Sequence, residues 1–198
     1  MASIDVYTRS IEMKDLYKDN YNPERFLSYC KKCRNFNRLH SCPPFDEDIG
    51  SYLDDYPYIT LIAVQLFYTE DEIEKYSGED ACMEYTKETL TPVSNQLREI
   101  LLKLENIYPN TLSLSSGGCN ICPDCNRIEG KPCRYPDKMR ISPEALGFDM
   151  MGILKEYFNI DLQWSKGSLP KYYTLIVGLC SMETLEIASD EIAQLFHN

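Results

Sequence analysis

Most of the cysteines fall in two short segments, and this grouping constrains the fold more than any other feature of the chain. The chain has nine cysteines, and the grouped ones are three in the first segment and four in the second: Cys30, Cys33 and Cys42, then Cys119, Cys122, Cys125 and Cys133. In a reducing compartment clustered cysteines are more often metal ligands or redox groups than disulfides. The chain must therefore fold so that each segment gathers its sulfur atoms around a centre.

The composition indicates a cytoplasmic protein with neither a membrane nor a nucleic-acid partner. No apolar run approaches the roughly 20 residues that span a bilayer. The segment from Met1 to Ser10 carries Asp5 and lacks the apolar core of a signal peptide. Lys and Arg number 20 against 31 Asp and Glu, and the resulting net charge of −11 argues against nucleic acid as the main partner.

The apolar patterning predicts strands and helices along one domain that spans residues 1–198. The segments 59–68 and 172–180 are rich in β-branched and aromatic residues and are typical of buried strands. Residues 111–115 are a candidate for a short third strand. A helix is expected to begin at Thr91 and Pro92, although Pro92 could instead kink a longer helix that starts near Cys82.

Two further helices are expected towards the C-terminus. Ser142 and Pro143 repeat the signal of a cap followed by proline and predict a helix to about Phe158, and residues 182–196 are a candidate closing helix. Strands separated by helices indicate an α/β fold, mixed α+β, with a central β-sheet flanked by helices. Two Cys-rich metal-binding loops, about residues 30–44 and 117–140, interrupt these elements. The order of the strands does not follow from the pattern.

The spacing of the second cysteine group favours a [4Fe–4S] cluster. A C-x2-C-x2-C run, here Cys119 to Cys125, is a known way to supply three of the four thiolates of such a cube from one loop. The fourth thiolate, Cys133, follows after seven residues, whereas the bacterial ferredoxin run places it after three. The alternative is a structural zinc site, because zinc accepts four thiolates. Zinc sites commonly use two C-x2-C pairs, so the spacing favours iron–sulfur.

The residues around the second group suit a charged cluster. Gly117 and Gly118 let the backbone approach closely, so that its amide groups can donate hydrogen bonds to cluster sulfur atoms. Five basic side chains against three acidic ones lie between Cys119 and Arg140 and offset the thiolate charge. Arg134 follows Cys133 directly and is the side chain expected to contact this site.

The first cysteine group offers only three thiols. Its segment between Cys30 and Cys42 contains no acidic residue and four basic ones: Lys31, Lys32, Arg34 and Arg38. Three thiols can hold a cluster and leave one iron open to water, a substrate sulfur or a small anion, as catalytic metal sites leave one position free. His40 or a distant cysteine could close the site instead, although an exposed loop position is the simpler interpretation of His40.

The two remaining cysteines stand apart. Cys180 ends a predicted buried strand, and it and Cys82 are expected to be small core residues. The seven grouped thiols could also surround one larger cluster, or two clusters close enough to exchange electrons. The sequence leaves these arrangements open.

Three segments taken together resemble a known family. They run from Cys30 to Cys42-Pro43-Pro44, from Cys119 to Cys133-Arg134-x-Pro136, and from Ser142-Pro143-Glu144 to Asp149. The combination resembles the prokaryotic family of predicted metal-binding proteins called domain of unknown function 2284, over about residues 25 to 180. The resemblance implies metal binding, with iron–sulfur suspected from the cysteines, and it names no substrate. The segment from Glu144 to Gly152 is then either a helix that covers a cluster or an ordinary packed helix.

Three functions fit these observations. The first is an electron-transfer or redox-accessory protein with a [4Fe–4S] cluster, or two, and a redox partner protein. The second is an enzyme whose open-iron cluster acts on a small-molecule substrate by sulfur transfer, desulfuration or reduction, so the sequence leaves enzymatic activity open. The third is a zinc-stabilised interaction module. The chain has no P-loop, no dinucleotide-binding fingerprint and no H-E-x-x-H motif.

Overall fold

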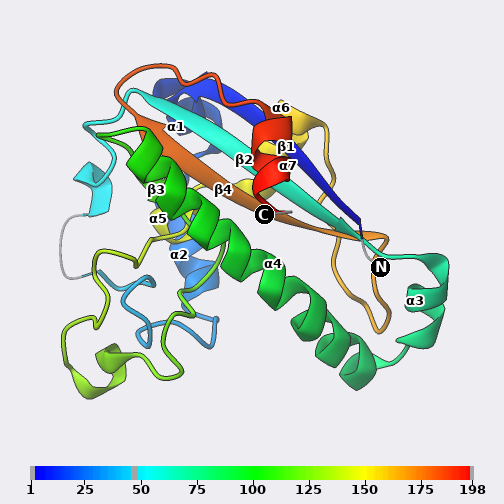
Figure 1. Cartoon of the computed structure of the whole chain (residues 1–198). Helices are drawn as coiled ribbons and strands as arrows, with labels where there is room; N and C mark the ends of the chain where they lie inside the picture. The colour runs from blue at the N-terminus through cyan, green and yellow to red at the C-terminus, as the bar shows by residue number, and fades with distance from the viewer. Residues whose placement is uncertain (1–2, 46–48, 197–198) are drawn as a thin grey trace.

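The computed structural model describes residues 3–45 and 49–196, and these form a mixed α+β domain around one four-stranded antiparallel sheet (Figure 1). The strand order is β1-β2-β4-β3. The strands are β1 (Ser3–Glu12), β2 (Tyr58–Phe67), β3 (Leu112–Leu114) and β4 (Tyr172–Ser181). The predicted mixed α+β fold and the three predicted strands are confirmed.

Strand β1 was not predicted, and its position in the sheet explains why. It lies at one edge and pairs only with β2, in register from Ser3 opposite Phe67 to Glu12 opposite Tyr58. Its residues alternate between exposed and half-buried, whereas β2 is buried along nearly its whole length. An edge strand with one wet face carries a weaker apolar signal than a strand covered on both faces.

Helices cover both faces of the sheet. On one face, Ile62 and Val64 of β2 pack with α4 (Glu79–Ile107) and α7 (Ser189–Leu195). On the other face, Leu61 and Ala63 pack with α1 (Met13–Asn20) and α6 (Met150–Phe158). Figure 1 shows the long green helix α4 crossing its face of the sheet obliquely. The remaining helices are α2 (Pro23–Cys30), α3 (Glu70–Lys75) and α5 (Pro143–Leu146), with short 3₁₀ turns at Ile49–Ser51 and Asn126–Glu129.

Two starts were considered for helix α4, one at Thr91 and one near Cys82, and the structure shows the longer helix. It begins at Glu79 and runs for 29 residues, with Pro92 inside it, so the expected start at Thr91 is wrong. The buried face of its second half recurs at three- and four-residue intervals through Val93, Leu97 and Leu101. Packing of this face on the sheet offsets the cost of an internal proline. None of the described helices has the length and apolar character that a bilayer span requires.

The helix predicted from Ser142 to Phe158 is divided in two at Gly147. Gly147 adopts a left-handed conformation with φ of 104° and ends α5, and the side chain of Asp149 then caps α6. The chain bends here because Phe148 is buried against the rings of Tyr17 and Tyr21, at centroid distances of 5.2 and 5.0 Å. A single straight helix could not bury Phe148 in this way.

The same bend joins α5 to the start of α2. The Gly147 carbonyl accepts a hydrogen bond of 2.9 Å from the Asn22 amide. A Cβ atom added at Gly147 would lie only 2.7 Å from the Cα atom of Pro23. Only glycine therefore permits the backbone approach that holds these two helices together.

Helix α4 is tied to the C-terminal end of the loop that follows β3. The Arg140 guanidinium pairs with the Glu105 carboxylate, with 2.8 Å between Nε and Oε1. Ser113 of β3 donates its backbone amide and its hydroxyl to the same oxygen, at 2.7 and 2.6 Å. Burial alone would raise the pKa of Glu105, but the hydrogen bonds from Arg140 and Ser113 hold that pKa below its usual value.

The substitution Gly147→Ala should destabilise the protein. A left-handed alanine costs about 1 kcal/mol, and the contact with Pro23 should add about 1–3 kcal/mol of overpacking. Gly167→Ala is the matched control, because Gly167 also has a positive φ of 81° but has no atom within 4 Å of an added Cβ. Urea denaturation measures both variants. Equal losses of unfolding free energy in the two would contradict the close approach of Pro23.

The substitution Arg140→Met should cost about 3 kcal/mol of unfolding free energy at neutral pH, because it leaves Glu105 buried without its cation. The side chains of this pair are 12% and 15% exposed. The pKa of Glu105 is lower in the folded state than in the unfolded state. The ion pair therefore stabilises the fold at pH values above the unfolded-state pKa, and this stabilisation is lost as the pH falls through the folded-state pKa. The loss caused by Arg140→Met should therefore shrink below about pH 4.

The control for Arg140→Met is Lys155→Met. Lys155 pairs with Asp161, and these side chains are 55% and 74% exposed. Removal of such an exposed pair should cost below about 1 kcal/mol. Urea denaturation at several pH values compares the two variants, and a pH-independent loss in Arg140→Met would show that the ion pair is not its cause.

Candidate metal centre

The two Cys-rich loops lie side by side at one end of the molecule. The first loop (residues 31–45) follows α2, and the second loop (residues 115–142) joins β3 to α5. Figure 1 shows the first in light blue and the second in yellow-green, together at the end of the molecule away from α3. The second loop is closed at its base, where the Ser115 amide donates to the Ile141 carbonyl at 3.0 Å. The second group is thus anchored to regular structure at both ends, and the first group at its start, where α2 ends.

All four cysteines of the second group line one cavity. This cavity has a volume of about 20 Å³ and is lined by Cys119, Cys122, Cys125 and Cys133. His40 of the first loop lies in its wall, together with Arg134 and Tyr135. The imidazole Nε2 of His40 is 3.0 Å from the Lys131 carbonyl oxygen. The second loop therefore wraps around its own thiols, and the first loop covers one side.

The three cysteines of the first group line a separate, larger cavity. It has a volume of about 160 Å³ and is lined by Cys30, Cys33 and Cys42. Gly117 and Gly118 of the second loop and Glu144 of α5 complete its wall with apolar neighbours such as Phe36. Cys30 is the last residue of α2, so its place is fixed by a helix. This cavity offers three thiols, one carboxyl group and room beside them.

A buried hydroxyl lies between the two groups. Ser41 is fully buried, and its Oγ accepts a hydrogen bond of 2.9 Å from the backbone amide of Cys119. The same Oγ is 3.9 Å from the sulfur atom of the next residue, Cys42. One side chain thus contacts a cysteine of each group, which places the two groups next to each other.

Arg127 holds the first loop against the second. Its guanidinium donates hydrogen bonds to the carbonyl oxygens of Leu39, at 3.0 Å, and Cys42, at 2.8 Å, and also to that of Pro44. These carbonyls lie in irregular chain, where no helix or sheet satisfies them. The cation therefore supplies hydrogen bonds to the first loop and positive charge beside its thiols.

The electrostatics of the thiols agree with this arrangement. Burial raises the pKa of Cys30 and of Cys42, and neighbouring cysteines of the same group raise each further. Burial also raises the pKa of Cys119. A hydrogen bond from the Ile121 amide and the charge of Arg98 lower that pKa and partly offset the effect of burial. Thiolates gathered in this way repel one another, and a bound cation would relieve that repulsion.

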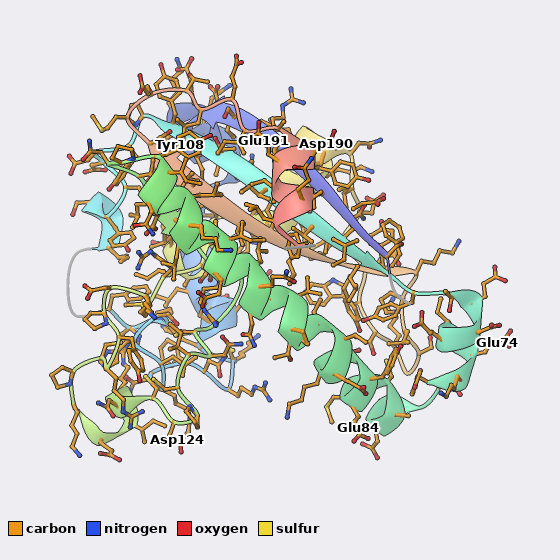
Figure 2. All side chains as sticks on the ribbon, viewed as in Figure 1. Glu74, Glu84, Tyr108, Asp124, Asp190 and Glu191 are labelled. Carbon is orange, nitrogen blue, oxygen red and sulfur yellow. The ribbon has the colours of Figure 1, made fainter. Side chains whose placement is uncertain are left out.

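Charge is distributed unevenly over the molecule. The first loop presents an exposed basic rim made of Lys31, Lys32, Arg34 and Arg38. Figure 2 places Glu74 and Glu84 at the opposite end, near α3 and the start of α4, whereas Asp124 projects from the second loop. The net charge of −11 therefore does not describe the surroundings of the cysteines.

The donor set suits a soft metal. Thiolates select zinc, copper(I) or iron–sulfur clusters. Within residues 3–45 and 49–196, no three or more His, Cys, Asp or Glu side chains form a group positioned to hold a single metal ion. An iron–sulfur cube makes a different demand, because each of its four thiolates binds a separate iron. The four cysteines of the second loop line one cavity.

The structure places the other candidate residues as follows. Arg134 donates to the Asp124 carbonyl across the second loop and reaches the four-cysteine cavity. Gly117 has a positive φ of 65°, and a Cβ at Gly118 would lie 2.8 Å from Asn35 of the first loop. Both glycines line the three-cysteine cavity, although they were expected beside the second group.

The isolated cysteines lie in the core. Cys180 and Cys82 are both fully buried, on opposite faces of the sheet. Neither lines one of the two cysteine cavities described above. His40 is half-buried rather than simply exposed, and it faces the four-cysteine cavity instead of closing the first group.

Sequence reasoning missed four residues that shape the two sites: Ser41, Arg98, Arg127 and Glu144. Each acts on a part of the chain distant in sequence; Ser41, for instance, lies 78 residues before its partner Cys119. No local spacing rule detects such pairs. Two of the four had been noted without a specific role: Arg127 among the five basic residues of the second segment, and Glu144 in the segment that carried the family resemblance.

The substitution Arg127→Ala should release the first loop, because the carbonyls of Cys42 and Pro44 lose the guanidinium donor and that of Leu39 keeps only the Cys42 amide. Hydrogen bonds to charged groups contribute about 1.5–3 kcal/mol, so amide hydrogen exchange at residues 37–42 should accelerate about tenfold or more. Arg134→Ala is the control, since Arg134 bonds within its own loop and should leave that exchange unchanged. Equal acceleration in both variants would show that Arg127 does not hold the loops together.

Comparison with known proteins identifies a family for this chain. The family model described as predicted metal-binding protein, DUF2284, matches residues 18–177, which include all seven grouped cysteines. Searches of curated proteins and of solved structures returned no match. The family resemblance expected from the three motif segments is thereby confirmed. The chain belongs to the family of predicted metal-binding proteins called domain of unknown function 2284.

Proposed function

We propose that this protein binds a [4Fe–4S] cluster through Cys119, Cys122, Cys125 and Cys133 and acts in electron transfer or as a redox accessory. The observation that supports this proposal is the single cavity lined by all four of these cysteines. A C-x2-C-x2-C run followed by a fourth thiol is a way of ligating such a cube. When bound, the cluster supplies one-electron redox chemistry.

A second cluster at the first cysteine group extends the proposal. The Ser41 hydroxyl contacts residues of both groups, so the two sites are close neighbours. The chain's own residues would hold the sites in place: Arg127 fixes the first loop by its carbonyls, and Arg134 braces the second loop. We infer a redox partner protein that docks on the loop end of the molecule, in the cytoplasm, where thiols remain reduced.

A second candidate function is an enzyme with an open iron at the first group. The observation that favours it is the three-cysteine cavity of about 160 Å³, which leaves space beside the thiols. The exposed basic rim of the first loop would attract an anionic small molecule. Sulfur transfer, desulfuration and reduction are the reaction classes that such a site suits.

A structural zinc site is the alternative of a different class, because zinc also accepts four thiolates. It requires the thiols to close on one ion, at Zn–S distances of about 2.3 Å. Metal and acid-labile sulfide per chain, measured on protein purified without oxygen, separate the alternatives. Iron and sulfide in equal amounts with a broad brown absorbance support the proposal, with about four irons for one cube and about eight for two. Zinc without sulfide or colour overturns it.

The substitution Cys122→Ala should remove about four irons per chain, because a cube that loses one of its thiolates is no longer held. Cys82→Ala is the control: it deletes the same atom from a cysteine that is buried in the core, away from both loops. Iron analysis and the visible spectrum measure the effect, with circular dichroism to verify folding. Full iron content in folded Cys122→Ala protein would remove this residue from the ligand set.

A further inference from the structure

Glu144 is an unusual residue in the three-cysteine cavity. It is the second residue of α5 and lies in the cavity wall with Cys30, Cys33 and Cys42. Its Oε2 atom is buried and has no hydrogen-bond partner among the described residues. A carboxyl group in such a position calls for a specific explanation.

Burial of this oxygen is costly for the protein as it stands. A buried carboxylate without a compensating partner is unfavourable, and proteins satisfy such groups by pairing them or by letting them coordinate metals. Burial raises the pKa of this carboxyl group. When ionised, it adds to burial and to Cys33 in raising the pKa of the Cys30 thiol, so the Glu144 carboxyl and the Cys30 thiol are neighbours in this cavity.

We propose that Glu144 is the fourth protein ligand of the metal cluster held by Cys30, Cys33 and Cys42. This inference rests on the proposed function. Three thiolates satisfy three of the four irons of a cube, and Glu144 lies in the wall of the cavity that these three cysteines line. The other residues considered for this role lie elsewhere. His40 lines the four-cysteine cavity, and Cys82 and Cys180 are in the core.

The scaffold fixes this carboxylate relative to the thiols. Cys30 ends α2 and Glu144 belongs to α5, and these two helices meet where Pro23 approaches Gly147. The Asn22 amide bonds the Gly147 carbonyl at the same contact. The distance between one thiol ligand and the carboxylate is therefore set by helix packing rather than by a free loop.

A carboxylate at the fourth position gives this site a distinct property. Oxygen is a harder ligand than thiolate and binds iron in such clusters less firmly. The carboxylate would therefore be the group that an incoming small ligand displaces, while the three thiolates would remain bound. The proposal thus assigns to the first cysteine group an iron whose fourth ligand, Glu144, can be exchanged.

The test compares wild-type protein with Glu144→Gln, both reconstituted with iron and sulfide without oxygen. Cyanide is the probe, and the electron paramagnetic resonance spectrum of the reduced cluster reports its binding to an open iron. If the carboxylate occupies the position nine-tenths of the time, its removal should lower the half-saturating cyanide concentration about tenfold. Glu129→Gln is the control, because Glu129 lies in the second loop, is exposed and pairs with Lys131.

The outcomes separate the ligand assignment from the proposed function. Cyanide saturation shifted in Glu144→Gln but unchanged in Glu129→Gln supports Glu144 as the ligand. Loss of the first cluster in Glu144→Gln, with iron falling from about eight to about four per chain, supports it as well, provided that circular dichroism shows a folded protein. Equal iron content and an unchanged cyanide response in Glu144→Gln overturn it while the four-cysteine cluster stands. An iron-free wild type overturns the proposed function itself, and this inference with it.

Discussion

The contact between the two Cys-rich loops is the interaction on which the candidate site depends. Apart from the turn at Asn126–Glu129, neither loop has regular structure to satisfy its backbone. Arg127 supplies donors to the carbonyls of the first loop, and the buried Ser41 hydroxyl accepts the Cys119 amide. Each loop thus completes the hydrogen bonding of the other. Helix α2 precedes the first loop, and β3 and α5 flank the second, but hydrogen bonds between the loops keep them together.

The sequence predicted the features that depend on short-range pattern. Ligand spacing is local, so the two groups from Cys30 to Cys42 and from Cys119 to Cys133 could be recognised directly, and each lines a cavity of its own. Strands β2 and β4 are buried on both faces and gave a strong apolar signal. The edge strand β1 has one solvent-exposed face, and its apolar pattern was too weak to be recognised as a strand.

Features that arise from packing between distant segments could not be predicted. The break at Gly147 follows from burial of Phe148 against Tyr21, and that contact exists only once α1 and α6 share a face of the sheet. Glu144 reaches the three-cysteine cavity because α5 packs on α2. The continuous α4 shows the reverse case, in which tertiary packing overrides the local signal of Pro92.

The shared position of Ser41 has a consequence for how the two proposed metal centres would fill. If a cluster orders the second loop, the Cys119 amide becomes fixed, and with it the Ser41 hydroxyl and the adjoining Cys42. The conformational entropy of the first loop is then partly lost before its own site fills, so the second loading event costs less. Assembly of the two proposed centres would thereby be coupled and positively cooperative. A cell would then hold mainly empty and fully loaded molecules, with few half-loaded ones between them.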